Sequence, residues 1–465
     1  MTPAPQAAAG SGRPDSAQPG TARPGAVRPD TEVVFDPATY VTGVPYDALG
    51  RLRRAGAVTW AEEIPVLGWP AGPGFWLVLR HAEVESVLRR PQLFSSWLGA
   101  TQIRDPASPA ALRYTRAMML NMDPPEHGRL RRMLARSFTP RAVARLEDRI
   151  RGHARALCER VLTGPRGACD FARDLAADLP LLTLADVLGV PEQDRWLLFD
   201  WSNRVIGYQD PDYAASAEFD AAGGTPMARE ALALRPAPDA AGRMPDPRTR
   251  AGMPDLYAYA HLLAEHKRSR PGPDVMSILL AQADEDGHRV TAEEFENMFW
   301  LFAVAGNETL RNGLPGACIA LLEHPAAQRE LRADPGLMPA AVAEMLRWWT
   351  PVMTFRRTAT RDCELGGQPV RGGDKVVVSF ASANRDEAVF ADPDRFDIRR
   401  DPNPHLVFGH GPHFCLGAHL ARLQMQALFT ELLARTSALE YAGEPAFLRS
   451  NFQRGVKRLP LAWSS

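Results

Sequence analysis

A ten-residue stretch near the C-terminal end of the chain, Phe408 to Gly417, constrains the fold more than any other segment. It has the sequence Phe-Gly-His-Gly-Pro-His-Phe-Cys-Leu-Gly and holds one cysteine, Cys415, among glycines. An apolar run from Ala418 to Leu433 follows at once and predicts a helix. Glycine adopts positive φ and lets the backbone approach a flat ligand closely. The segment therefore predicts a tight loop that presents one thiol at the start of a helix.

This setting of Cys415 suits a thiolate that ligates iron. Backbone N–H groups of the loop and the positive end of the following helix stabilise negative charge on the sulfur. An axial thiolate on haem iron is the ligand that favours cleavage of the O–O bond. The alternative is a buried structural cysteine in a glycine-rich turn, which is the commoner role of a lone cysteine.

The composition limits the kinds of binding partner that we expect for this chain. The chain has 465 residues, 45% hydrophobic and 23% charged, as in ordinary globular proteins. Lys and Arg number 54 against 55 Asp and Glu, so the charge balance gives no reason to expect nucleic acid or a membrane surface as partner. The five cysteines are widely spaced without a C-x-x-C pair, which favours neither a zinc site nor a disulfide framework and predicts a reducing, cytoplasmic compartment.

Two segments stand apart from the rest of the chain. Residues 1–30 are rich in Pro, Ala and Gly and lack the apolar core of a signal peptide, so they predict a disordered tail. Residues 31–465 are expected to form a single domain without a membrane anchor, because no apolar run approaches the length needed to span a bilayer. Within that domain, Ala221–Pro254 is crowded with Pro and Gly and predicts a long insertion without regular structure, a candidate lid.

Hydrophobic periodicity predicts a mainly α chain with small sheets. Helices are expected at Tyr46–Ala55, His81–Leu88, Glu126–Ser137, Pro140–Leu162, Leu179–Leu188, Glu192–Ile206, Leu256–Ser269, Met276–Ala283, Ala292–Leu322, Pro325–Arg332, Met338–Thr350 and Ala418–Thr436. Strands are expected at Phe75–Leu79, Thr358–Glu364, Val370–Val378 and near Val456–Leu461. Proline removes a helix hydrogen bond, so Pro315 is expected to kink the long helix one to two turns past Thr309.

A second motif, Ala305-Gly-Asn-Glu-Thr309, lies inside the apolar helix Ala292–Leu322. An acid and a hydroxyl in such surroundings are costly unless they are paired. The structural interpretation is a buried Glu308 held by a neighbour and a Thr309 that bonds back to a main-chain carbonyl. A third motif, Glu344-x-x-Arg347, is by itself an ordinary ion pair on one helix face.

Together these motifs resemble the cytochrome P450 family. The order Phe-Gly-x-Gly-x-His-x-Cys-x-Gly matches that family's haem-binding loop position for position, and Ala305–Thr309 resembles the acid–alcohol pair of its central helix. The resemblance extends from near Phe35 to the C-terminus. It implies the cytochrome P450 fold, a roughly triangular helical domain with small β-sheets, and haem b (iron protoporphyrin IX) as cofactor.

The resemblance also implies residue roles. Cys415 would be the metal ligand, and Glu308 and Thr309 would manage the protons of dioxygen activation. Haem would contact the following residues, the last four through its propionates: Ala305, Phe408, Gly409, Gly417, His127, Arg131, Arg357 and His413. The fork of an arginine suits a carboxylate. Arg357 is preferred to Arg356 because it lies five residues before Asp362. Glu344, Arg347 and Arg395 would form a buried structural network behind the haem.

The implied activity is monooxygenation of a hydrophobic small molecule, such as a terpenoid, steroid or other secondary metabolite, by hydroxylation or epoxidation with O₂. The chain holds no flavin or ferredoxin segment, so a ferredoxin and its reductase are the expected electron donors. The segments Met119–Pro125, Arg385–Phe390 and Asp401–His405 look closest to bacterial hydroxylases of steroids, terpenes and methyl-branched lipids. The alternatives are a haem-thiolate protein that uses peroxide and a haem-binding protein that is not an oxygenase.

The resemblance to the family also predicts a substrate-facing surface and a surface for a protein partner. The segments expected to face the substrate are Trp97–Met118, Val205–Tyr213, Leu301–Ala305, Val352–Phe355 and Ser450–Phe452, and their apolar and aromatic content suits a hydrophobic ligand. A local basic block is expected either to dock an acidic electron-transfer protein or to be ordinary solvated charge: Arg129, Arg131, Arg132, Arg136, Arg141 and Arg145.

Overall fold

The computed structural model describes residues 29–464, apart from 165–166, 211–220, 241–243 and 248. Helices dominate this part of the chain, as the periodicity predicts. They are α1 (Asp30–Phe35), α2 (Tyr46–Ala55), α3 (His81–Arg89), α4 (Pro109–Arg116), α5 (Glu126–Ala135), α6 (Pro140–Ala144), α7 (Glu147–Leu162), α8 (Phe171–Asp174), α9 (Asp178–Leu188), α10 (Arg195–Ile206), α12 (Pro226–Leu232), α13 (Pro254–Ser269), α14 (Val275–Ala281), α15 (Ala292–Glu323), α16 (Pro325–Ala333), α17 (Met338–Trp349), α18 (Phe380–Ala383) and α19 (Ala418–Ala434).

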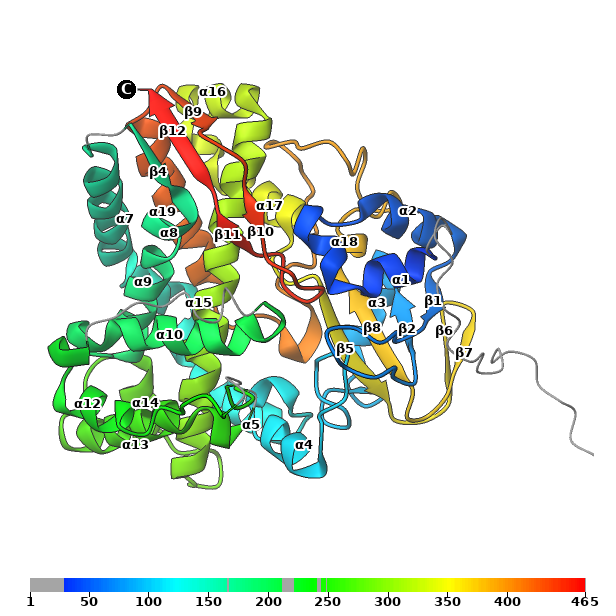
Figure 1. Ribbon diagram of the computed structural model, residues 1–465, viewed down its shortest axis with the longest axis horizontal. Coiled ribbons are helices and arrows are strands. Elements are labelled where there is room, and N and C mark those ends of the chain that lie inside the picture. The colour runs from blue at the N-terminus through cyan, green and yellow to red at the C-terminus, as the bar shows by residue number, and fades with distance from the viewer. Residues whose placement is uncertain (1–28, 165–166, 211–220, 241–243, 248, 465) are drawn as a thin grey trace, which may run out of the picture.

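The strands form small sheets. The largest has the order β1-β2-β8-β5-β3 and the next has the order β4-β12-β9, while β10 pairs with β11 and β6 with β7. Their bounds are β1 (Val58–Ala61), β2 (Phe75–Val78), β3 (Phe94–Ser95), β4 (Ala168–Asp170), β5 (Thr354–Ala359), β6 (Cys363–Leu365), β7 (Gln368–Val370), β8 (Lys375–Ser379), β9 (Ala438–Tyr441), β10 (Ala446–Phe447), β11 (Val456–Arg458) and β12 (Pro460–Ser464). In Figure 1 the five-stranded sheet lies with α1, α2 and α3 on one side of the molecule, and most helices lie on the other.

Tight turns account for the strand predictions that are wrong. The expected strand Thr358–Glu364 is the end of β5, a turn, and the start of β6, while Val370–Val378 combines the end of β7 with most of β8. Gly373 turns the chain between β7 and β8 with φ +91°. The expected strand Val456–Leu461 is likewise divided between β11 and β12. A turn of this kind is not visible in the pattern of apolar residues when the residues on both of its sides are apolar.

Two helix predictions also need correction. The expected helix Pro140–Leu162 is divided into α6 and α7, and the first residues of Glu192–Ile206 form a 3₁₀ turn before α10 begins. The helix through Pro315 continues to Glu323, one residue past the predicted end. Residues on both sides of Pro315 are buried, so packing maintains the helix where the proline removes a hydrogen bond. The tail predicted at 1–30 lies outside the described residues except for its last two positions.

Helix α15 passes through the core and sets the position of the site (Figure 1). It begins with a capping box, in which Thr291 and Glu294 each accept a hydrogen bond from the other's backbone N–H. Close helix contacts fix its place. A Cβ on Gly316 would lie 2.0 Å from the Trp349 ring of α17, and one on Gly306 would lie 2.9 Å from Leu184 of α9. None of the helices in the described part of the chain combines the length and apolar character required to cross a bilayer.

Candidate haem site and substrate cavity

The loop that carries Cys415 has the tight geometry expected from its sequence. Gly409 adopts φ +69°, and the Cys415 N–H donates to the carbonyl of Phe408 at 2.8 Å. Gly411 has φ +67°, and a Cβ there would lie 2.5 Å from the carbonyl oxygen of Leu88 in α3. The loop therefore packs on α3 without side chains in between, and it delivers Cys415 to the start of α19.

The thiol of Cys415 sits in a mixed electrostatic environment. Its side chain is solvent-accessible, yet enough protein surrounds the sulfur that burial raises the pKa of the thiol. The backbone N–H of Gly417 and the guanidinium groups of Arg131 and Arg422 act in the opposite direction. A metal ion deprotonates a coordinating thiol, and these donors then stabilise the anionic sulfur. The donor set fits an anionic iron ligand.

Arg422 is a site residue that the sequence interpretation missed. It lies seven residues after Cys415, within the second turn of α19, and its guanidinium carbon is 4.4 Å from the centroid of the Phe408 ring. Burial lowers the pKa of this guanidinium, and the nearby Cys415 thiol acts in the opposite direction. An arginine in the first two turns of the helix that follows the cysteine is the signal that could have identified it.

The four side chains expected at the haem propionates lie together. The rings of His127 and His413 are 4.1 Å apart, centroid to centroid. Burial, followed by the charge of Arg131, lowers the pKa of His127 to about 4. Burial and then Arg357 hold the pKa of His413 well below its ordinary value. Burial alone lowers the pKa of Arg357 to about 10, against a small opposing effect of Asp123.

The hydrogen-bond partners of Arg131 and Arg357 show whether this cluster fits the propionates of haem. Within the described residues, neither Arg131 nor Arg357 forms an ion pair with a carboxylate; their guanidinium groups donate to the carbonyls of Phe414 and Arg356. Arg357 is buried and Arg131 is half-buried. Cations with little access to water and no anionic partner are costly, and two carboxylates would compensate them. The neighbouring Arg356 is engaged elsewhere, because it pairs with Asp105 at 2.6 Å. The cluster therefore fits the two propionates of haem, with Arg357 rather than Arg356.

One face of α15 opens onto a cavity of about 180 Å³. Ala305 and Gly306 are exposed although the helix is buried on both sides of them. Ala305 and Thr309 line the cavity, together with residues of every segment expected to face the substrate. Its other lining residues include Met118, Leu120, Val205, Ile206, Leu301, Val304, Val352, Phe355 and Phe452. Part of the expected segment Val205–Tyr213, from residue 211, lies outside the described residues.

The side chains of Glu308 and Thr309 lie on different faces of α15. The hydroxyl of Thr309 donates to the carbonyl of Ala305 at 2.9 Å at the cavity wall. Glu308 is fully buried on the α10 side, where Ser202 donates to it at 2.9 Å and Arg311 pairs with it at 3.0 Å. Consecutive helix positions differ by about 100°, so the two side chains do not share a face. The structure brings Thr309 to the cavity and places Glu308 in an ion pair behind it.

The Glu344–Arg347 pair is buried, and its third member differs from the prediction. Arg347 donates to both carboxylate oxygens of Glu344 at 2.7 Å, with both side chains fully inaccessible to solvent. Arg395 contributes only its carbonyl oxygen to this network, because its side chain is exposed and pairs with Asp397. Arg400 instead reaches Glu344 at 3.2 Å. The prediction of Arg395 as the second cation is thus wrong, since the local turn directs its side chain outward.

The Pro-rich segment Ala221–Pro254 is partly regular, against expectation. Thr225 caps α12, and both Ala228 and Ala231 of that helix are fully buried. At its far end, Asp246 lines the cavity. The part around Asp246 therefore lies where a lid would lie, while α12 is a packed element. The lid role stays a prediction.

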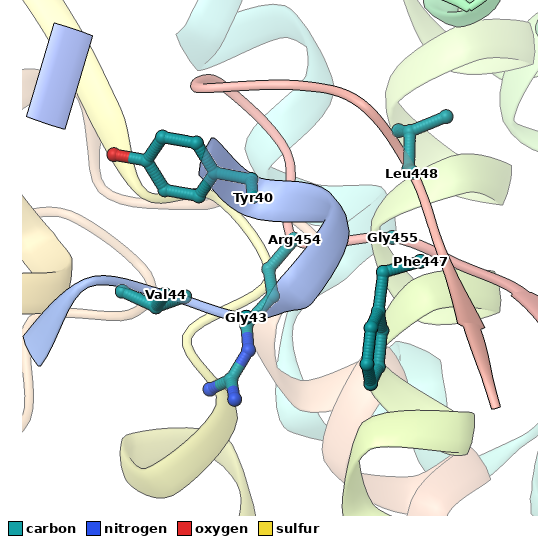
Figure 2. A pocket seen from close by; sticks show the side chains of 7 residues that line it. All are labelled: Tyr40, Gly43, Val44, Phe447, Leu448, Arg454 and Gly455. Atoms are coloured by element: carbon teal, nitrogen blue, oxygen red, sulfur yellow. The ribbon is translucent and has the colours of Figure 1, made fainter. Parts of the chain in front are cut away.

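Figure 2 shows a different hollow, between the segment near Tyr40 and the C-terminal strands. It measures about 10 Å³, enough for a single water molecule. Its lining residues are Tyr40, Gly43, Val44, Phe447, Leu448, Arg454 and Gly455. None of the predicted site residues is among them.

Proteins of known sequence and structure resemble this chain. Residues 336–445 match the family model described as cytochrome P450. A steroid C26-monooxygenase of Rhodococcus jostii is 34% identical over 92% of this chain and 84% of the relative. A methyl-branched lipid omega-hydroxylase of Mycobacterium tuberculosis is 38% identical over 90% of both chains. Among solved structures, a Mycobacterium marinum cytochrome P450 in complex with pseudoionone superposes with a TM-score of 0.77 and 36% identity, over 90% of this chain and 94% of that one.

Proposed function

This chain belongs to the cytochrome P450 family and is a haem-thiolate monooxygenase, and we propose that it hydroxylates an apolar steroid, terpenoid or branched-chain lipid. The observation that carries the proposal is the cavity bounded by Thr309 and Ala305, whose remaining wall is largely apolar. Apolar walls with a few polar groups are typical of sites that bind hydrophobic small molecules. Relatives that hydroxylate steroids and methyl-branched lipids support the same substrate range.

The residues of this chain have distinct tasks in that reaction. Haem b, when bound, supplies the iron chemistry that activates dioxygen. Cys415 would hold the iron as an anionic ligand, with the N–H of Gly417 and the charges of Arg131 and Arg422 stabilising its sulfur. His127, His413 and Arg357, together with Arg131, would hold the propionates. Contacts of Ala305, Phe408, Gly409 and Gly417 with the macrocycle are part of the same proposal.

Proton delivery falls to Thr309 and Glu308. The Thr309 hydroxyl lies at the cavity wall and can exchange its bond to the Ala305 carbonyl for one to a reacting group. Glu308 is held by Ser202 and Arg311, so its part in the relay requires a change of partner. A protein that used peroxide as oxidant would not need this pair, and its presence in α15 favours dioxygen over the peroxide alternative.

Substrate screening tests the proposal. Purified haem-loaded protein is titrated with steroids, terpenoids and branched lipids while the Soret band is followed, and ligands that shift the spin state are then incubated with a ferredoxin, its reductase and reduced nicotinamide. We expect a hydroxylated product from at least one spin-shifting ligand. If apolar ligands bind and no oxygenated product forms with any donor pair, the protein is a haem-binding non-oxygenase.

The basic block near α5 is proposed as the contact of the ferredoxin. Its charge is partly compensated, because Arg129 pairs with Asp284 and Glu294, and Arg132 lies 3.1 Å from Glu285. Both members of the Arg132 pair are strongly exposed, and exposed ion pairs of this kind contribute little. Arg132 therefore remains available to an acidic partner.

Replacing Arg132 with glutamate should slow haem reduction by an acidic ferredoxin several-fold at low salt. The difference should shrink above about 0.5 M salt, where the screening length falls to a few ångströms. Stopped-flow reduction rates at several ionic strengths measure this. The matched control is Arg155→Glu on α7, another exposed arginine that contacts a glutamate. Equal rates for Arg132→Glu and the unsubstituted protein at every salt concentration would show that the block is solvated charge.

The compartment is proposed to be the cytoplasm. All five cysteines have free thiols, and two of them, Cys158 and Cys318, are buried. Free thiols of this kind persist in a reducing compartment.

A further inference from the structure

Gln453 brings a polar side chain into the wall of the substrate cavity. It lies between β10 and β11 and lines the cavity together with the apolar side chains of Val352, Phe355 and Phe452. Only 3% of Gln453 is exposed. An amide with so little access to water is costly unless both of its polar atoms find partners.

The oxygen of the Gln453 amide has its partner in α15. Asn312, which is fully buried, donates from Nδ2 to Oε1 of Gln453 at 3.0 Å. Gly455 permits this close approach, since a Cβ there would lie 3.1 Å from Oδ1 of Asn312. Turning the Gln453 amide over would set two NH₂ groups against each other. Oε1 therefore faces α15, and Nε2 lies on the opposite side of the amide.

The Nε2 of Gln453 has no hydrogen-bond partner among the described residues. It differs in this setting from Oδ1 of Asn312, which also lacks a partner but is sealed from solvent. Nε2 is not sealed in this way, so the small exposed part of Gln453 includes it. Because Gln453 lines the cavity, this N–H donor faces the cavity.

The hydroxyl groups of the threonines in the same wall are already donating within the protein. Thr309 donates to the carbonyl of its own helix at 2.9 Å. Thr101 donates to Oδ1 of Asn121 at 2.8 Å, and Thr115 donates to the carbonyl of Ala111 at 2.7 Å. A hydroxyl carries one proton, so each of these groups gives up a protein partner when it donates to a ligand. Gln453 donates without that loss.

The backbone around Gln453 is fixed by neighbouring segments. Its own N–H donates to Oγ of Ser450 at 3.1 Å, and Gln453 forms a β-bridge with Val352. The next N–H, that of Arg454, donates to the carbonyl of Pro351 at 2.8 Å. A donor that is already held in place costs little ordering when a ligand binds.

The position of Gln453 relative to Thr309 selects the chemistry of the ligand. Asn312 follows Thr309 by three residues, and residues at this spacing are neighbours on a helix surface. Gln453 therefore contacts α15 within one turn of Thr309. A ligand hydroxyl would need an acceptor for its own proton, but Val352 and Phe452 beside Gln453 are apolar. A carbonyl oxygen only accepts, so it matches this donor.

We propose that Nε2 of Gln453 donates a hydrogen bond to the carbonyl oxygen of an apolar ketone and so sets which of its carbons lies beside Ala305 and Thr309. Gln453 is then a specificity-determining residue of the monooxygenase, and Asn312 is a positioning residue that orients its amide. The inference rests on the proposed function and narrows its substrate class to neutral carbonyl compounds.

The test uses one carbon skeleton in three oxidation states. Haem-loaded protein is titrated with β-ionone, its alcohol β-ionol and the matching hydrocarbon, and dissociation constants are taken from the Soret shift and from calorimetry. The ketone should bind roughly three- to tenfold more tightly than the hydrocarbon, as expected for one buried neutral hydrogen bond, and more tightly than the alcohol. Gln453→Met should bring the ketone to the affinity of the hydrocarbon, with hydrocarbon binding unchanged.

Gln453→Glu keeps an oxygen for Asn312, so it tests the inference even where Gln453→Met does not fold. A carboxyl donates only while it is protonated. The affinity of this variant for the ketone should therefore fall as the pH rises, while that of the unsubstituted protein stays constant over the same range. Gln193→Met, at an exposed glutamine before α10, should leave all three dissociation constants unchanged.

Three results would overturn the inference: equal binding of ketone and hydrocarbon, an equal loss of both in Gln453→Met, or binding of none of the three compounds. Gln102 lines the same cavity, and loss of the ketone preference in Gln102→Met with its retention in Gln453→Met would assign the donor to Gln102 instead. In each case a hydroxylated product from any other apolar ligand leaves the monooxygenase proposal intact, whereas its absence from every ligand overturns that proposal.

Discussion

Replacement of Cys415 by alanine is expected to abolish both the red-shifted Soret band of the reduced, carbon-monoxide-bound protein and all turnover. The physical reason is that none of the described residues around Cys415 supplies a second soft anionic ligand. The titratable groups of the neighbouring cluster are the imidazoles of His127 and His413, whose lowered pKa values keep them neutral, and the guanidinium groups of Arg131 and Arg422. The spectrum of the reduced protein with and without carbon monoxide measures the effect.

Cys363→Ala is the matched control, because Cys363 on β6 is a partly exposed thiol in another part of the molecule. That variant should keep the full red-shifted band. Haem content, measured as a pyridine complex, shows whether Cys415→Ala still binds the macrocycle through the histidine and arginine cluster. A red-shifted band in Cys415→Ala, at any fraction of the original intensity, would mean that another residue ligates the iron.

Replacement of Thr309 by alanine is expected to preserve substrate binding while the electrons are diverted to hydrogen peroxide. Among the residues that the structure describes, the hydroxyl bonds only to the Ala305 carbonyl of its own helix, so its loss breaks no contact between these elements. Positioned proton transfer contributes roughly 10²–10⁴ in rate, and the loss of one participant should lower the product formed per reduced nicotinamide by at least about tenfold. Product, peroxide and nicotinamide consumption are measured together.

Two further variants serve as controls for the Thr309→Ala experiment. Thr309→Ser retains the hydroxyl and should restore most of the product yield. Ser202→Ala removes the hydroxyl that donates to Glu308 on the α10 side, and a loss of yield in this variant would place Glu308 in the same proton path. An unchanged product ratio in Thr309→Ala would remove Thr309 from the mechanism and leave it as a helix residue bonded to its own backbone.

The local features of the site could be predicted from the sequence because each is set by residues close together in the chain. The glycines around Cys415 dictate a tight loop, as the positive φ of Gly409 and Gly411 shows. The periodicity of α15 and the choice of Arg357 over Arg356 follow from the same kind of short-range information, and the structure places Arg357 in the buried cluster beside His413. Short-range spacing therefore identified the family and predicted which residues would hold the haem.

Side-chain partners over long sequence separations were decided only by the tertiary structure. Arg400, rather than Arg395, reaches Glu344 because the turns before it set the direction of each side chain. Glu308 faces Ser202 of α10, whereas Thr309, one position later, faces the cavity. The contact of Tyr114 with Tyr257 joins residues 143 positions apart. No spacing rule relates such residues, since packing of the elements and burial of their polar groups bring them together. The sequence by itself thus predicted the thiol loop that would ligate the iron, and the tertiary structure decided which polar groups line the cavity.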